Sequence, residues 1–248
     1  MKRSLKDLKG HSLETKDGLK GKVKDFLFDD KTWVIRFIEA DFGNIFQKDR
    51  VLLPMITLAK PLWDQKHFPL DIDRKKIENC PKPEEKPTVS RDYEKALSEY
   101  YGYENYWNYD YNGRGSANMF FPPRPLRIPT KVISEKDLHT NLRSFNEVKG
   151  YHINAIEGKL GHLEDLIIDD IDCQIAYIVV DTSNWRPWSK KVMLSVNWLE
   201  DISYVNLDVS VNLHVDTIKE APEADLSKPL ELEYERALVD YYETNPNT

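Results

Sequence analysis

Apolar runs in this chain alternate with short polar segments at the spacing of β-strands. The segments 22–28 and 33–39 are rich in valine, isoleucine and aromatic residues, and the polar stretch 29–32 between them favours a turn. The pattern therefore predicts a hairpin over 22–39. The continuous triplet Phe26-Leu27-Phe28 is typical of a strand covered on both faces, as when a small sheet closes and a helix packs outside it.

A helical period follows the strands. Tyr93, Leu97 and Tyr100 recur at helical spacing after Ser90, a residue type that caps helix N-termini. The same stripe returns near the end of the sequence, at Tyr234, Leu238 and Tyr241. We expect both stripes to dock their helices on the preceding strands.

The glycines reveal an internal duplication. Only 10 of the 248 residues are glycine, and six of them form two triplets related by an offset of 140: Gly10, Gly18, Gly21 and Gly150, Gly158, Gly161. The same offset relates Asp25, Asp29 and Asp30 to Asp165, Asp169 and Asp170. With one inserted residue, the segment 93–101 matches 234–242. The sequence thus predicts two related domains of about 100 residues each.

The duplication sets the expected fold and boundaries. We predict a mainly β protein with two small barrels, each followed by a short α-helix. The first repeat spans 1–101, an aromatic and proline-rich linker spans 102–130, and the second repeat spans 131–248.

Four repeated glycines have expected structural roles. Gly18 and Gly158 each follow an acidic residue at a turn, where glycine adopts positive φ at little cost. Gly21 and Gly161 lie inside strand patterns, where glycine marks a bulge or a close approach of the backbone.

The repeated residues resemble the PRC-barrel domain, a family named after the cytoplasmic domain of the photosynthetic reaction centre H subunit. The resemblance rests on residues 8–10, 17–30 and 50–54; in the second repeat, Asp-Gly becomes Glu-Gly at 157–158 and the proline becomes Ser195. A more distant relative is the C-terminal domain of the ribosome maturation factor RimM. The resemblance implies six-stranded barrels with a binding or adaptor role, and its motif residues are structural rather than catalytic.

Sequence motifs for catalysis or cofactor binding are missing. The chain has no phosphate-binding glycine loop, nucleophile elbow or paired-histidine metal helix. Two weak metal candidates stay open, namely His152 with His162, and His67 with Asp71 and Asp73. The repeated aspartates are a third, although an Asp-Asp pair between strands also suits a tight turn. We predict no catalytic, cofactor-binding or metal residues.

Cysteine content and hydropathy bear on localisation. The two cysteines, Cys80 and Cys173, are too few for a disulfide framework, which is typical of a reducing compartment. The first residues lack the apolar core of a signal peptide, and the longest apolar run, 175–180, is too short for a membrane span. We therefore expect a cytoplasmic protein without a transmembrane segment.

The net charge of −7 hides an asymmetry between the two halves. Residues 1–80 carry a net charge of +4, whereas residues 131–248 carry −11. The acidic half repels nucleic acids, which makes them poor partners. The opposite signs leave self-association open, either within one chain or head to tail between chains.

The segment between the repeats is aromatic. Residues 100–111 hold six of the 13 tyrosines, whereas flexible linkers avoid aromatic side chains because these pack. Three interpretations stay open: a clasp of the two repeats, a tyrosine-rich recognition surface, or a base-stacking platform. The candidate partner surface comprises Tyr103, Tyr106, Trp107 and Tyr109.

These observations favour a non-enzymatic binding or scaffold protein that mediates protein–protein contacts. The alternative is an RNA- or ribosome-associated assembly factor, by analogy with RimM. Both rest on fold-level analogy, and the sequence does not identify the protein partner.

Overall fold

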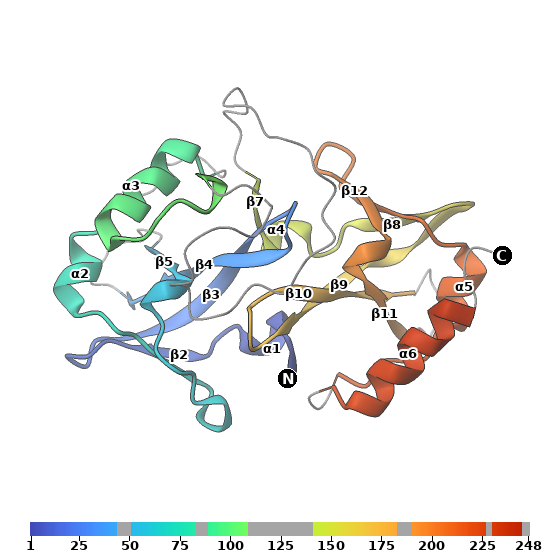
Figure 1. Cartoon of the computed structure of the whole chain (residues 1–248), viewed down its shortest axis with the longest axis horizontal. Helices are drawn as coiled ribbons and strands as arrows, with labels where there is room; N and C mark the ends of the chain where they lie inside the picture. Colours follow the sequence, from blue (N-terminus) through green and yellow to red (C-terminus); the bar gives the residue numbers. More distant parts are fainter. Residues whose placement is uncertain (44–50, 83–88, 109–140, 183–189, 227–229, 245–248) are drawn as a thin grey trace. The chain divides into compact units, whose positions relative to one another are not determined.

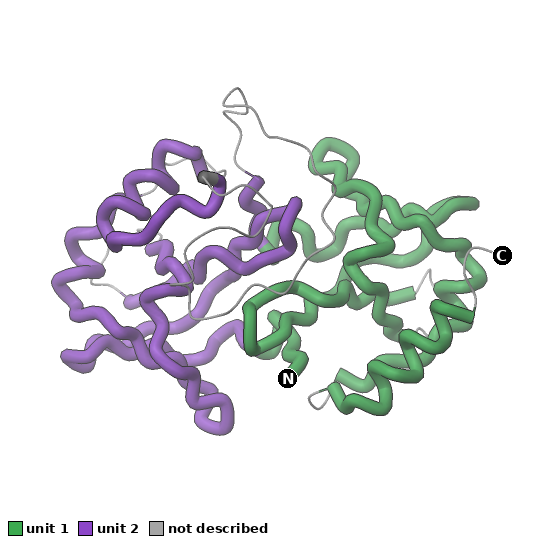
Figure 2. Tube along the Cα trace, in the orientation of Figure 1, with its two compact units in different colours: residues 1–7, 145–248 green, residues 8–144 purple. Residues whose placement is uncertain are grey.

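The computed structural model describes residues 1–43, 51–82, 89–108, 141–182, 190–226 and 230–244 (Figure 1). The protein is mainly β, with two mixed sheets and few helices. It divides into two compact units, coloured separately in Figure 2. Unit 1 comprises residues 1–7 and 145–248, and unit 2 comprises residues 8–144.

Unit 2 contains a six-stranded sheet in the order β5-β4-β3-β2-β6, with β7 pairing with β3 outside this path. Its strands are β2 (Ser12–Glu14), β3 (Lys20–Asp29), β4 (Val34–Asp41), β5 (Val51–Pro54), β6 (His67–Pro69) and β7 (Leu142–Ser144). The predicted hairpin is confirmed as β3 and β4, which are antiparallel. Its helices are α2 (Arg74–Glu78) and α3 (Arg91–Tyr101), with 3-10 turns η2 (Met55–Thr57), η3 (Trp63–Gln65) and η4 (Tyr106–Asn108).

Unit 1 contains a seven-stranded sheet in the order β11-β10-β9-β8-β13-β12, with β1 pairing with β9 outside this path. Its strands are β1 (Lys2–Ser4), β8 (His152–Ala155), β9 (Gly158–Asp169), β10 (Ile175–Asp181), β11 (Lys191–Ser195), β12 (Leu199–Ser203) and β13 (Asp208–Val211). The helical elements are α4 (Phe145–Val148), η5 (Val196–Trp198), α5 (Val215–Glu220) and α6 (Leu232–Thr244). A further short helix, α1 (Leu5–Leu8), follows β1.

Helices α3 and α6 form where the tyrosine stripes predict them, and the Ser90 side chain caps α3 by accepting a hydrogen bond from the Tyr93 N–H (3.2 Å). The outer tyrosines of each helix donate to main-chain carbonyls at equivalent positions. These are Tyr93 to Pro81 (3.0 Å), Tyr100 to Lys76 (2.9 Å), Tyr234 to Pro222 (3.1 Å) and Tyr241 to Thr217 (2.8 Å). Residues that are 141 apart in the sequence therefore occupy equivalent structural positions. Residues of α3 and α6 can be compared one by one on this basis.

The two repeats exchange their first strands. β1 belongs to the first repeat but pairs with β9 of the second, with Arg3 opposite Ile168. Its copy β7 belongs to the second repeat but pairs with β3 of the first, with Arg143 opposite Phe28. The expected boundaries, 1–101 and 131–248, follow the repeats, whereas each compact unit includes a strand from the other repeat.

Candidate functional site

The repeated aspartates hold the exchanged strands. Ser4 donates a hydrogen bond to Asp165, and its copy Ser144 donates to Asp25. Both carboxylates are at least 98 % buried, and burial raises the pKa of Asp165 even though several hydrogen bonds act against it. A short polar side chain on each exchanged strand therefore satisfies a carboxylate that would otherwise be costly to bury.

The aspartates at the hairpin turns act in the same attachment. Arg3 donates to Asp170 (2.7 Å), and the equivalent Arg143 forms an ion pair with Asp30 (3.4 Å). Asp29 accepts the N–H groups of the turn that follows it, at 2.8 and 2.9 Å, as a turn-forming aspartate does. These residues, considered in the sequence as cation ligands, thus have structural partners in both units.

The other metal candidates have their own contacts. His152 and His162 lie opposite each other on β8 and β9, His67 Nδ1 is 2.9 Å from Ser12 Oγ, and Asp71 forms an ion pair with Lys16. Among the residues that the structure describes, no group of three or more His, Cys, Asp or Glu side chains is placed to hold a metal ion.

The repeated glycines permit turns and close backbone contacts. Gly18 and Gly158 have positive φ, of 85° and 149°. A Cβ on Gly21 would lie 2.5 Å from the Phe42 ring, and one on Gly161 would lie 1.9 Å from the Asp181 carbonyl oxygen. Only glycine fits the last two positions without a shift of the neighbouring chain.

Three of the four predicted surface aromatics lie against α3. The Tyr106 hydroxyl donates to Glu94 Oε2 (2.7 Å), and the Arg36 guanidinium lies 4.0 Å from the Tyr106 ring centre. Arg91 lies 4.2 Å from the Trp107 ring centre and pairs with Glu94 Oε1 (3.3 Å). The aromatic rings of 102–107 thus cover one face of α3 and pack against the guanidinium groups of Arg36 and Arg91.

Burial changes the chemistry of these tyrosines. It raises the pKa of both Tyr103 and Tyr106, and nearby Glu94 acts in the same direction. Both hydroxyls are therefore protonated at neutral pH, and that of Tyr106 donates to Glu94. Tyr109, the fourth predicted residue, lies outside the described residues.

The corresponding face of α6 is largely uncovered. At the positions of Arg91, Glu94 and Ser98, unit 1 has Leu232, Glu235 and Val239. Leu232 is 61 % exposed and Val239 is 45 % exposed, whereas Glu94 and Ser98 are each 1 % exposed. The sequence pattern did not predict this difference because the tyrosine stripes of the two helices are the same.

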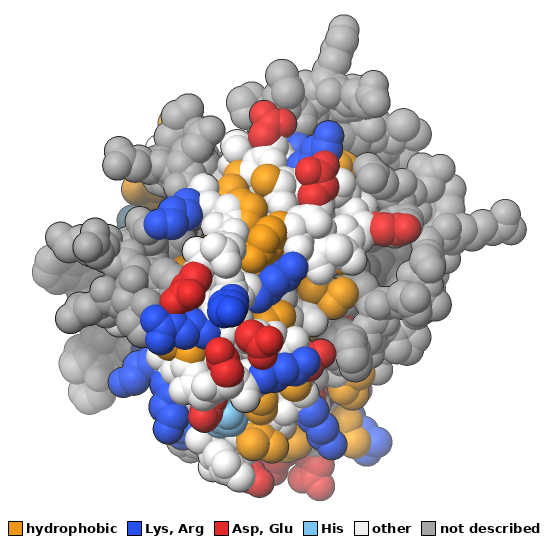
Figure 3. Space-filling model, turned by 90° about the vertical axis from the view of Figure 1, so that its left-hand side faces the viewer, with side chains coloured by type: hydrophobic (Ala, Val, Ile, Leu, Met, Phe, Trp, Pro, Cys, Tyr) orange, Lys and Arg blue, Asp and Glu red, His pale blue; other side chains and the backbone are white. Residues whose placement is uncertain are grey.

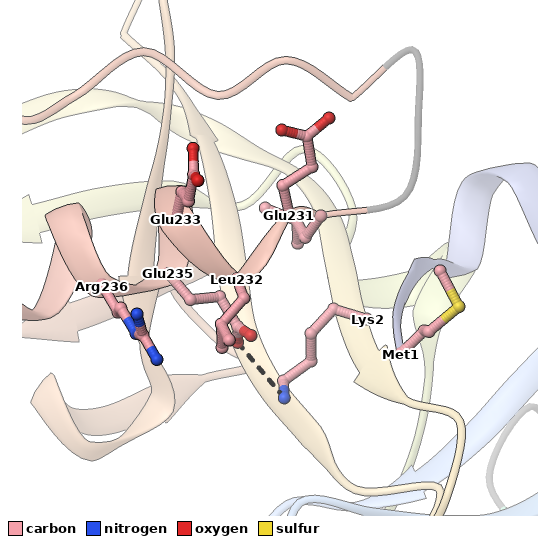
Figure 4. A pocket seen from close by; sticks show the side chains of 8 residues that line it. Met1, Lys2, Glu231, Leu232, Glu233, Glu235 and Arg236 are labelled. Atoms are coloured by element: carbon pink, nitrogen blue, oxygen red, sulfur yellow. Dashed lines mark ion pairs between the residues drawn. The ribbon is translucent and has the colours of Figure 1, made fainter.

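A pocket of about 690 Å³ adjoins this face and is lined by Met1, Lys2 and residues 230–236. Figure 4 shows Lys2 reaching Glu235, while Glu231 and Glu233 point away from the pair. The Lys2 ammonium lies 3.2 Å from Glu235 Oε1, and the Tyr177 hydroxyl lies 3.3 Å from the same oxygen.

The turn between β12 and β13 is a second exposed apolar feature. Val205 is 93 % exposed and Leu207 is 52 % exposed, and Leu207 has a φ of 55°. The equivalent residues of unit 2 are Asp64 and Lys66, and Lys66 has a φ of 51°. These two positions of the turn are therefore polar in unit 2 and apolar in unit 1.

The lysines that give the first repeat its positive charge are partly neutralised. Lys16 forms an ion pair with Asp71 (2.6 Å), and Lys24 forms one with Asp41 (3.0 Å). In Figure 3, acidic and basic side chains lie side by side on the described part of one face of unit 2. Such mixed charge gives little electrostatic attraction for a polyanion.

No known protein family and no curated protein matches this chain. Within the described ranges, none of the helices has the length and apolar character needed to cross a bilayer.

Proposed function

We propose that this chain is a protein-binding adaptor built from two PRC-type barrels. The repeated glycines, the hairpins and the helix that follows each set of strands support the barrel assignment. Each of these features occurs in both repeats with the same internal spacing, and the resemblance to the PRC-barrel domain rests on that spacing. In this proposal the residues that are the same in both units maintain the fold. The residues that differ between the units bind the partner.

The observation that carries the proposal is the apolar turn at 204–207. Single exposed apolar residues are common on protein surfaces. Here, however, two of them flank Asn206, and Leu207 adopts a left-handed conformation that costs an L-residue about 1 kcal/mol. Because Asp64 and Lys66 are found at the same turn in unit 2, the fold does not require apolar side chains there.

Adjacent aromatic residues support a contact surface at this turn. Tyr204 lies in the turn, and its ring packs edge-on against the Tyr151 ring at 6.3 Å between centres. An anchored tyrosine beside exposed aliphatic side chains is the composition of a protein-contact surface.

The test exchanges the turn residues for those of the other unit. In Val205→Asp/Leu207→Lys, we expect an unchanged fold, since unit 2 already has these residues at the equivalent backbone conformation. Both proteins serve as bait in extracts of the native cell, with quantitative mass spectrometry of what each retains. We expect proteins that the wild type retains to be lost from the variant.

Two results would contradict the proposal. One is retention of the same proteins, in the same amounts, by the wild type and the variant. The other is retention of the wild type on heparin or RNA at moderate salt, which would favour the RNA-associated alternative.

A further inference from the structure

A row of metal-ligating residue types crosses the sheet of unit 1. Strand register places four side chains opposite one another on neighbouring strands, and side chains in register point to the same face of a sheet. In order across β13, β8, β9 and β10, these residues are Asp208, His152, His162 and Asp181. The two central positions are both histidine, the commonest side chain among protein metal ligands.

The two histidines face away from the core and lie close to each other. The next residues along the strands, Ile153 and Leu163, are at most 1 % exposed, whereas His152 is exposed and His162 is half-buried. The His152 N–H donates to the Leu207 carbonyl (3.0 Å) and not to β9, so the two histidines form a non-hydrogen-bonded pair. Side chains approach most closely at such pairs, with Cβ atoms about 4.5–5.5 Å apart.

The imidazoles make no polar contact that would compete with a metal ion. Within the described part of the chain, neither ring takes part in a hydrogen bond or an ion pair. Two imidazoles at this spacing can each place one nitrogen about 2 Å from a single ion. Because no group of three or more ligating side chains is placed around one point among the described residues, water completes the coordination.

The equivalent row of unit 2 has different chemistry. In order across β6, β2, β3 and β4, its residues are His67, Ser12, Lys22 and Asp41. The Ser12 hydroxyl lies 2.9 Å from His67 Nδ1, and the Lys22 ammonium brings a positive charge to the position of His162. Since the same backbone accepts serine and lysine in unit 2, the fold does not require histidines at these positions in unit 1.

Carboxylates lie at both ends of the row in unit 1. Asp208 is in register with His152, and Asp181 is in register with His162. Negative charge on both sides favours a bound cation, and a carboxylate neighbour is common beside a metal-ligating imidazole. The row therefore combines two nitrogen ligands with acidic flanks, whereas the row of unit 2 combines one histidine with a lysine.

We propose that His152 and His162 bind one divalent transition-metal ion on the outer face of unit 1, with Cu²⁺ held more tightly than Ni²⁺ or Zn²⁺. Each imidazole supplies one nitrogen, and water fills the remaining positions. The ion links β8 to β9. This site goes beyond the adaptor function, and metal binding is measured on the purified protein whether or not the 204–207 turn binds a partner.

The test adds Cu²⁺ alone to the full chain at neutral pH, with equilibrium dialysis for the stoichiometry and electron paramagnetic resonance for the ligands. We expect one ion per chain at the tightest site and the nitrogen couplings of two imidazoles. His152→Ser introduces the residue that unit 2 has at this position, so the fold should be retained. It should weaken Cu²⁺ binding by about tenfold or more, because it removes one of two protein ligands. His162→Asn should have the same effect.

Matched histidine variants locate the site. His67→Gln changes the histidine of the equivalent row in unit 2, and His214→Gln changes a histidine that contacts Glu157. Both should bind Cu²⁺ as tightly as the wild type does. Thermal unfolding without metal confirms that each variant is folded.

Three results would overturn the proposal. In the first, dialysis leaves no Cu²⁺ on the protein. In the second, His152→Ser and His162→Asn bind the ion as tightly as the wild type. In the third, the spectrum shows a single imidazole ligand, or His214→Gln removes the binding, which would place the ion elsewhere on the chain.

Discussion

Gly21 and Gly161 occupy the same position in the two repeats, and a close approach of the neighbouring chain favours glycine at both; Gly161 in addition has a positive φ of 62°. In each case the backbone of the neighbouring strand runs so close that a Cβ would overlap it: Asp41 O lies 2.8 Å from the Cβ position at Gly21, and Asp181 O lies 1.9 Å from that at Gly161. The sequence predicted a bulge or close approach here, because a lone glycine within a strand pattern usually marks one of these two features.

We expect Gly161→Ala to destabilise unit 1 by more than about 3 kcal/mol, because the obstacle is a main-chain carbonyl that cannot rotate away. Gly150→Ala is the matched control. Gly150 has a φ of 92° but nothing within 4 Å of its Cβ position, so its cost is only the conformational preference, about 1–2 kcal/mol. Urea unfolding at neutral pH measures both, and equal losses of stability would contradict a steric cause at Gly161.

At the level of elements, the sequence was informative wherever the determinant is local. The β3–β4 hairpin follows from apolar runs around a polar turn, and α3 follows from the tyrosine stripe and the Ser90 cap. The exchange of β1 and β7 could not be predicted in this way. A three-residue strand has the same local pattern whichever sheet it joins, and the choice depends on contacts more than 100 residues away.

The same distinction between local and non-local determinants applies to the candidate surfaces. Aromatic residues at 103–107 predict packing, and the structure places them on α3. The exposure of Val205 and Leu207 was not predictable, because apolar residues in a strand-rich segment are usually buried. The open face of α6 could be recognised only by comparison with α3. Side chains of 102–107 cover this face of α3, whereas the equivalent face of α6 is exposed.

The exchanged strands differ at one position that matches their surroundings. Lys2 lies against Asp169 (3.0 Å) and Glu235 (3.2 Å) in unit 1. Its copy Leu142 is 3 % exposed and belongs to the apolar cluster of unit 2, beside Leu27 and Leu97. Lys2 therefore meets carboxylates in unit 1, and Leu142 meets apolar side chains in unit 2. This match favours pairing of each strand with the sheet of the other repeat rather than with its own.

We predict that Lys2→Met lowers the stability of unit 1 at pH 7 and that this difference shrinks as the pH falls below 3.8. Burial alone would raise the pKa of Asp169, but the Ile171 N–H and Lys2 outweigh it and hold the pKa below 3.8. A lowered carboxyl pKa stabilises the folded state above pH 3.8, and this contribution is lost as the pH falls through the native pKa. Because water screens the partly exposed pair, we expect about 1 kcal/mol at pH 7.

Urea unfolding of the wild type and Lys2→Met at pH 7 and near pH 2.5 measures this difference. Lys159→Met, which removes an exposed lysine from β9, should change stability by less than about 0.5 kcal/mol at both pH values. A loss in Lys2→Met that stays the same in acid would mean that the lysine acts through packing rather than through its ion pairs with Asp169 and Glu235.

At the level of the whole chain, the exchange makes each unit depend on both repeats. The contacts that attach β1 and β7 are duplicated: a serine on a buried aspartate and an arginine on the turn aspartate in each unit. The chain passes between the units at 7/8 and 144/145, so the covalent link through 109–140 is not the only connection between the repeats. The exchanged strands supply a second, non-covalent connection.

We therefore predict that the two halves stay associated after the chain is cut between the repeats. A specific protease site inserted between residues 120 and 121 allows cleavage of the folded protein, and size-exclusion chromatography at neutral pH then compares cut and uncut samples. Both fragments should elute together at the uncut position. Cutting the variant Ser4→Ala/Ser144→Ala should weaken the association, since each substitution leaves a buried aspartate without its hydroxyl donor, at a cost of about 1–3 kcal/mol per site. Separation of the wild-type fragments under native conditions would show that the exchanged strands do not hold the repeats together. If the fragments of the double variant stay associated as strongly as those of the wild type, the serine–aspartate hydrogen bonds are not responsible for the association.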